Sequence, residues 1–147
     1  MIIPDIGIKK LVEDGFLPPD LTIGPSSVDL TLSDSFSWTE PDKDKIILGE
    51  SVPHKQVQKD EFVLEPNHFV LASTGESISV PHDKATYVEG RSSIGHSELH
   101  VQNVGFIDVG FHGQITLELE NQSGFPIVLN KGVRICQIVF VQMSHSA

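Results

Sequence analysis

Several features that particular protein classes need are scarce or missing in this sequence. Its 147 residues include one cysteine, Cys136, so neither an intrachain disulfide nor a multi-cysteine zinc site can form. No stretch approaches the roughly eighteen apolar residues of a membrane span. The first ten residues lack the basic start and long apolar run of a signal peptide. We therefore expect no membrane span and no signal peptide, and we take the cytoplasm as the compartment.

Positive charge is also scarce. Ten lysine and arginine residues face 20 aspartate and glutamate residues, which gives a formal net charge of −10. Binding to DNA or RNA without sequence preference needs a positive footprint, so nucleic acid is not an expected partner. An anionic ligand would have to be held by a few local donors, by backbone N–H groups or by a metal. Arg91 and Arg134 are the only arginines, which makes each of them informative.

The chain does contain many short apolar or alternating stretches, separated by glycine, proline, asparagine or aspartate. A helical pattern follows Pro4–Asp5 and ends at Gly15, whereas residues 33–60 are polar and are expected to be irregular with short strands. Many short strands predict one β-barrel, sandwich or jelly-roll domain over residues 1–147. Its last strand is apolar on both faces and is therefore expected to be central or at a subunit contact. The other predicted strands, besides 134–142, are 27–32, 62–64, 69–73, 77–80, 85–89, 114–120 and 127–129.

The segment Gly90–Gly95 could bind an anion. Arg91 offers forked donors for phosphate oxygens, Ser92 and Ser93 add hydroxyl donors, and glycine lets a ligand approach the backbone closely. The alternative is a turn followed by a short helix that one of the two serines caps. The residues alone support both interpretations.

Two further segments place carboxylates at defined positions. Asp108 lies among glycines and aromatic residues, where it could orient a sugar hydroxyl or activate water, or could simply cap a turn. Residues 114–121 alternate, so Glu118 lies on the polar face of a strand. That carboxylate is either solvated or points into a pocket as a general acid and base.

The last segment, residues 131–137, is typical of a turn that leads into a core strand. Arg134 and Gln137 are either structural or face a ligand, and the spacing does not decide between these roles. Cys136 lies in an apolar run and is expected to be a buried small residue rather than a nucleophile. The seven histidines show no metal-ligand spacing such as HExxH, so no zinc site is predicted.

In this order, the segments resemble the dCTP deaminase and dUTPase superfamily, and they are closest to the dCTP deaminase branch, which includes bifunctional dCTP deaminase–dUTPases. The resemblance spans most of the chain and is weakest over residues 33–60. It implies a mainly β fold: a distorted, dUTPase-like β-barrel or jelly roll with a short N-terminal helix. It also implies a homotrimer with active sites between subunits. The segments that carry it are residues 2–10, 25–30, 89–93, 105–111, 115–119 and 132–137.

The resemblance further implies an activity, the hydrolytic deamination of dCTP to dUTP without zinc, which bifunctional members continue to dUMP. Glu118 would move protons while water attacks C4 of cytosine. Arg91, Ser92 and Ser93 would bind the triphosphate, and Ser92 would also lie near that water. Asp108 would meet the deoxyribose 3′-hydroxyl and, in dUTPases and bifunctional members, would activate water for attack at the α-phosphate.

The remaining implied contacts concern the phosphates and the metal. Gln137 matches a family glutamine near the phosphates. Mg²⁺ is expected to arrive on the triphosphate with few direct protein ligands. This would also reduce the repulsion between an acidic protein and a highly charged nucleotide.

Three departures from the deaminase pattern keep other functions open. His96 stands where deaminases typically have a second arginine, and it resembles some dUTPases. The hairpin that reads the base is one residue longer and contains Asn103, whose amide can pair with uracil or cytosine. After Gln142 neither branch's C-terminal lid motif is evident. The alternatives are therefore a dUTPase, supported by His96, Asn103 and Asp108, and a non-catalytic relative that binds a nucleotide or a protein.

Overall fold

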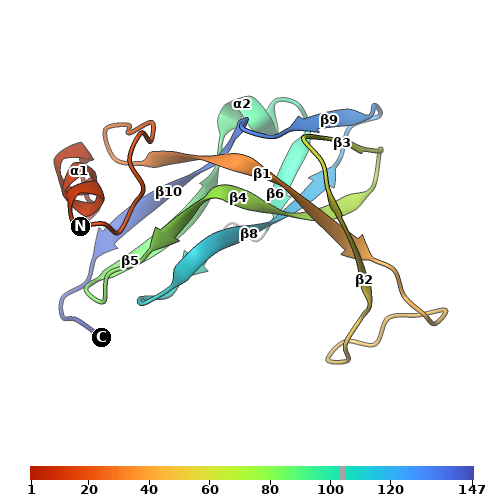
Figure 1. Ribbon diagram of the computed structural model, residues 1–147, viewed down its shortest axis with the longest axis horizontal. Helices are drawn as coiled ribbons and strands as arrows, with labels where there is room; N and C mark the ends of the chain where they lie inside the picture. The colour runs from red at the N-terminus through yellow and green to blue at the C-terminus, as the bar shows by residue number, and fades with distance from the viewer. Residues whose placement is uncertain (103–104) are drawn as a thin grey trace.

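Alternating apolar residues let each strand bury one face, and strands accordingly make up most of the regular structure. The computed structural model describes residues 1–102 and 105–147. The fold is mainly β, as the sequence predicts, and its main sheet is strongly curled (Figure 1). The elements are α1 (Asp5–Glu13), β1 (Val28–Thr39), β2 (His54–Gln58), β3 (Glu61–Leu64), β4 (Phe69–Ser79), β5 (Lys84–Gly90), α2 (Ser92–Gly95), β6 (Leu99–Gln102), β7 (Phe106–Ile107), β8 (His112–Asn121), β9 (Ile127–Asn130) and β10 (Arg134–Gln142).

The main sheet has eight strands and is antiparallel. Its order is β6-β8-β4-β1-β10-β5-β7, with β2 paired to the second half of β1, while β3 and β9 form a separate sheet. The edge strands β6 and β7 follow each other in sequence, with only residues 103–105 between them. An extended residue spans at most about 3.6 Å, so the two edges approach to within about 15 Å there. The chain therefore draws the sheet round towards a barrel.

The strand β10 is central, as its apolar sequence predicts. It lies between β1 and β5, with Ile138 opposite Val28 on one side and opposite Val88 on the other. Ile138 and Phe140 are completely buried. Because both neighbours are paired along much of its length, β10 holds together the part of the sheet that carries the candidate site.

The short N-terminal helix is also confirmed. Ile8 and Leu11 bury the inner face of α1, and Gly15 ends it with a φ of 83°, a left-handed conformation that glycine adopts readily. The two ends of the chain lie side by side (Figure 1). Ile2 forms an antiparallel bridge with Val141. None of the helices in the described part of the chain is long and apolar enough to cross a membrane.

The expectation for residues 33–60 was partly wrong. Strand β1 continues to Thr39, and β2 pairs with it from His54 to Gln58, so only residues 40–53 and 59–60 lack strand structure. Most side chains in the second half of β1 are polar, so the sequence pattern did not indicate a strand there. Phe36 is completely buried, however, and its ring stacks on that of Phe62 with centroids 4.6 Å apart. One buried aromatic residue and pairing on both sides suffice to keep this half of β1 extended.

Residues 69–79 form one strand rather than the two that the sequence predicts. The pairing of β4 with β8 shifts register between Ser73 and Ser77. The apolar alternation is interrupted at the same place, which is why the sequence predicted two strands. Gly75 lies in this irregularity, where a Cβ would come 3.0 Å from the Thr31 hydroxyl. Glu76 turns back and accepts hydrogen bonds from Thr31 N and Oγ1, each at 2.6 Å. The bulge therefore fastens β4 to β1.

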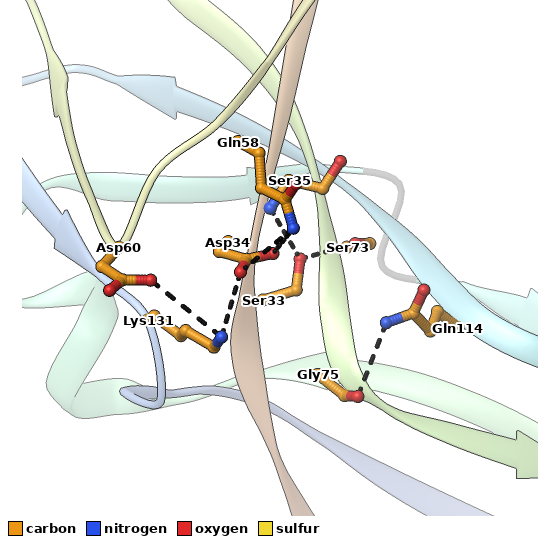
Figure 2. Close-up of polar contacts among 9 residues, drawn as sticks. All are labelled: Ser33, Asp34, Ser35, Gln58, Asp60, Ser73, Gly75, Gln114 and Lys131. Carbon is orange, nitrogen blue, oxygen red and sulfur yellow. Dashed lines mark hydrogen bonds and ion pairs between the residues drawn. The ribbon is translucent and has the colours of Figure 1, made fainter.

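A polar cluster ties the turn before β10 to the middle of β1 (Figure 2). Lys131 Nζ donates to Asp34 Oδ2 at 3.0 Å and lies 4.0 Å from an Asp60 oxygen, while Gln58 Nε2 lies 3.4 Å from both Asp34 oxygens. The Lys131 ammonium holds the pKa of Asp34 below its ordinary value. Because Lys131, Asp60 and Gln58 are exposed to solvent and only Asp34 is half-buried, the cluster restrains geometry more than it adds stability.

A buried amide joins the two sheets. Asn121, at the end of β8, is completely buried and donates to the carbonyl oxygens of Leu64 at 2.9 Å and Phe125 at 2.8 Å. Its own oxygen accepts from Ser123 N and Oγ. Every hydrogen-bonding position of this side chain is therefore used without water.

We predict that Asn121→Asp destabilises the protein. A buried carboxylate would face two carbonyl oxygens and lose both donors, which should cost about 3 kcal/mol of unfolding free energy, measured by urea denaturation. The matched change Gln122→Glu, at the exposed neighbouring position, should stay within about 0.5 kcal/mol of the wild type. Equal stability of the two variants would contradict the role given to Asn121.

Candidate active site

The anion-binding segment begins where β5 ends. Gly90 closes the strand, Arg91 keeps an extended backbone with φ −103° and ψ 136°, and the helical turn α2 starts at Ser92. No side chain caps this turn, so the interpretation that Ser92 or Ser93 caps it is wrong. Both serines instead occupy the first turn and are exposed. Their hydroxyls make no hydrogen bond to any residue that the structure describes, which leaves them available to a ligand.

The side chain of Arg91 folds back onto the sheet. Its Nη1 forms an ion pair with Asp29 Oδ1, and the two side chains are only 23% and 13% exposed. The second arginine, Arg134, reaches the other oxygen of the same carboxylate at 3.5 Å. Arg91 Nε is buried and has no hydrogen-bond partner among the described residues. A buried N–H donor normally has an acceptor, so the hydrogen bonding of this guanidinium is incomplete among the described residues.

Gln137 lies beside this arginine. Its Oε1 accepts from Ser27 Oγ at 3.0 Å, and its Nε2 lies 3.3 Å from the carbonyl oxygen of Gly90. On β10 it stands opposite Asp29 of β1 and Glu89 of β5. The structure therefore brings together Arg91, Gln137 and the two serines, four of the residues assigned to the phosphates.

A cavity of about 340 Å³ opens between α2 and β6 next to this group. Arg91 and Gly95 line one side of it, and His100 and Gln102 line the other. Gln102 also stands directly opposite Glu118 in the pairing of β6 with β8. The strand β6 thus links the cavity of Arg91 to the strand of Glu118.

Glu118 lies on the polar face of β8, as the alternation predicts. Its neighbours Leu117 and Leu119 are buried in the core, whereas Glu118 is half-buried on the opposite face. Across the ladders it faces Leu71 of β4 and Gln102 of β6. The carboxylate is therefore neither fully solvated nor enclosed within this chain.

Asp108 lies away from the residues that were assigned to the phosphates. It follows β7, whose Ile107 pairs with Thr86, so Asp108 is near the start of β5 while Arg91 follows its end. At about 3.3 Å per residue, this separation is on the order of 15–20 Å. The Asp108 side chain is exposed, and Asn103 lies outside the described residues. One chain therefore provides the predicted site residues in separate places.

The residue that sequence reasoning missed is Asp29. It lies within the segment 25–30, but alternation alone placed it on a polar strand face with no partner. The pairing with both arginines depends on the neighbouring strands β10 and β5, which the linear sequence does not order. The only hint of this pairing in the sequence was that the chain has just two arginines.

Cys136 is buried, as predicted. Its side chain is completely inaccessible, and burial, reinforced by the carboxylates of Glu76 and Asp29, raises the pKa of the thiol to about 12. A protonated thiol is neither a nucleophile nor a good metal ligand at neutral pH. Among the residues that the structure describes, no three His, Cys, Asp or Glu side chains form a group that could hold a metal ion.

We predict that Cys136 resists alkylation in the folded protein. A pH of 8 is far below the pKa of the Cys136 thiol, so the thiol is protonated, and it is also shielded from the reagent. Iodoacetamide should therefore leave the native protein unlabelled in intact-mass spectra. The same reagent should label the chain fully in denaturing urea. Rapid labelling of the native protein would contradict the burial of this strand.

The chain matches a family model described as dCTP deaminase-like over residues 2–143. A Hydrogenobaculum protein named "dCTP deaminase, dUMP-forming" is 46% identical over 145 residues, which cover 98% of this chain and 80% of that protein. A Sulfurihydrogenibium protein of the same name is 40% identical over 97% of this chain and 84% of its own.

Two solved structures are similar. The 2′-deoxycytidine 5′-triphosphate deaminase of Agrobacterium tumefaciens superposes with a TM-score of 0.75 at 25% identity, over 98% of this chain and 48% of that longer chain. A mutant dUTPase of phage 80alpha gives a TM-score of 0.52 at 21% identity, over 60% of this chain and 74% of its own, and supports the fold alone. From the family match and these relatives, the chain belongs to the dCTP deaminase-like family.

Proposed function

We propose that this protein deaminates dCTP hydrolytically without zinc and carries the product on to dUMP. Over the two steps, dCTP and two water molecules give dUMP, ammonia and diphosphate. Relatives at 40% and 46% identity are named for dUMP formation, which favours the second step. The low basic charge of the chain fits a small anionic substrate held by a few local donors better than a nucleic acid.

The observation that carries the proposal is the position of Glu118. Its half-buried carboxylate stands opposite Gln102, and Gln102 lines the cavity that Arg91 also lines. A proton carrier is thus one strand away from the donors suited to a triphosphate. In the deamination, the water oxygen bonds to C4 and the bond from C4 to the amino nitrogen breaks. Glu118 accepts one proton of the water and passes it to the amino group, which leaves as ammonia, while the second water proton ends on N3 of the uracil ring.

The other site residues hold the nucleotide. Arg91, Ser92, Ser93 and Gln137 bind the phosphates through donors that lie together at the end of β5, and Ser92 also orients the attacking water. Asp108 binds the deoxyribose 3′-hydroxyl and serves as the base for the second water, which attacks the α-phosphate. The amide of Asn103 reads the edge of the pyrimidine.

The metal fits best as part of the substrate. Mg²⁺ prefers oxygen ligands and keeps several waters, so phosphate oxygens can supply most of its coordination. Glu89 stands opposite Gln137, while the carboxylates of Asp29 and Glu76 are already occupied by arginine and threonine partners. Mg²⁺ bound to the triphosphate would lower the substrate's charge before it meets an acidic protein.

A dUTPase without deaminase activity is the second candidate. His96, which is exposed at the end of α2 and resembles the residue of some dUTPases, favours it. A nucleotide-binding protein without turnover is the third. Incubation with dCTP and with dUTP, each with Mg²⁺, separates them: dUMP from dCTP supports the proposal, dUMP from dUTP alone supports the dUTPase, and no product supports binding only. Conversion of dCTP to dUTP alone would remove the second step.

We predict that Glu118→Gln abolishes ammonia release from dCTP. The variant keeps the size and polarity of the side chain but cannot carry a proton, so kcat should fall about a hundredfold to ten-thousandfold while the KM changes little. Glu120→Gln is the matched control, because Glu120 lies two positions along on the same face of β8 and is also half-buried. It should keep wild-type turnover. Equal losses in both variants, or none, would remove Glu118 from the mechanism.

We also propose that the active site is completed between subunits of a homotrimer. The separation of Asp108 from Arg91, and the position of Glu118 on a half-buried face, leave each chain with parts of a site. The sheet face of β5 and β10 offers a contact surface, since Tyr87 and Ile2 are 41% and 58% exposed beside Val139 and Val141. A cyclic trimer would repeat the same contact three times.

We predict that two inactive variants restore each other. Asp108→Asn and Arg91→Gln chains with different tags, co-expressed and purified through both tags, should form dUMP from dCTP, which neither variant forms alone. The mixed trimer contains interfaces in which both residues are wild type. A single-chain site would recover nothing, and a monomer mass in native mass spectrometry would also exclude the shared site.

A further inference from the structure

The only two arginines of the chain share one carboxylate. Arg91 pairs with Asp29 Oδ1, and Arg134 Nη1 lies 3.5 Å from Oδ2. The side chain of Asp29 is 13% exposed, whereas that of Arg134 is 52% exposed. Each carboxylate oxygen thus has its own guanidinium, and the three side chains carry a net charge of +1 in a chain of net charge −10.

The position of Asp29 is tightly determined. It lies on β1 directly opposite Gln137 of β10, and the flanking residues Val28 and Leu30 are completely buried. Gln137 is itself held by Ser27 and by the carbonyl oxygen of Gly90, the residue before Arg91. A carboxylate on such a strand can hold a guanidinium in one place far better than a loop residue can.

Each of the two arginines also lines a cavity, and Asp29 lines one of the two. Arg91 lines the cavity of about 340 Å³ against α2, and Arg134 lines a second of about 470 Å³ together with Asp29 and Thr31. A guanidinium has five N–H donors, so both arginines keep donors after pairing with Asp29. Arg91 Nε is buried and lacks a partner among the described residues. The unused donors point to a ligand with several acceptor oxygens.

We propose that Asp29 is a positioning residue that sets Arg91 and Arg134 as a pair of guanidinium groups for one polyphosphate chain, with Arg134 as the second phosphate-binding cation. The identity of the nucleotide rests on the function proposed above, but the pairing of the arginines does not. Because Asp29 fixes both side chains before the ligand arrives, less rotamer freedom is lost on binding. The arginines also offer forked geometry, which lysine cannot replace.

Calorimetric titration with sodium tripolyphosphate, alongside dCTP kinetics, tests the proposal. Asp29→Asn should weaken tripolyphosphate binding about tenfold and raise the KM for dCTP similarly, with kcat within about twofold. Asp29→Glu should recover part of the affinity. Asp34→Asn is the matched control, because Asp34 lies on the same strand and pairs with Lys131 away from both cavities. It should leave both measurements unchanged.

Arg134→Gln gives a second test that does not depend on a half-buried residue. It should weaken tripolyphosphate binding by about five- to tenfold through loss of charge-assisted hydrogen bonds, while Lys131→Gln should not. A lowered melting temperature in Asp29→Asn with unchanged affinity and KM would make Asp29 purely structural and overturn the proposal, as would full affinity in Arg134→Gln. Wild-type protein that binds tripolyphosphate but leaves dCTP unchanged would refute the proposed function and leave the paired arginines standing.

Discussion

The pairing of β10 with β1 and β5 is the interaction on which the rest of the structure depends. It buries Val28, Ile138 and Val88 in one row and, on the opposite face, aligns Asp29, Gln137 and Glu89. The same ladder that excludes water from the core therefore builds the polar group beside Arg91. Stability and the proposed phosphate-binding residues depend on the same register, so a slip by one residue would exchange the two faces and lose both.

The candidate site combines rigid and open parts. Gln137 and Asp29 are fixed by strand pairing, and Arg91 is tied to them, whereas the hydroxyls of Ser92 and Ser93 have no hydrogen-bond partner among the described residues. Such a division suits phosphate recognition, because fixed cations set position and free donors adapt to the ligand oxygens. Asp108 and Arg91 lie apart within one chain, which is consistent with the expectation of a site shared between subunits.

The sequence predicted what depends on short-range pattern. Alternation placed Glu118 on the polar face of β8, and the apolar run of β10 indicated a central strand, because both are local consequences of burial. It missed the strand over residues 33–39, where only Phe36 and Trp38 are apolar and neighbouring strands hold the polar residues extended. It also could not find the bridge from Asp29 to two arginines, since the ion pairs span residues 29, 91 and 134, and pairing across β10 is a long-range property.

The connection between the edge strands β6 and β7 has a further consequence. These strands end the main sheet on opposite sides, and a connection of only three residues, 103–105, lies between them. Each residue added there would let the two edges move apart by up to about 3.6 Å, and each one removed would draw them closer together. The length of this connection therefore limits how widely the curled sheet can open.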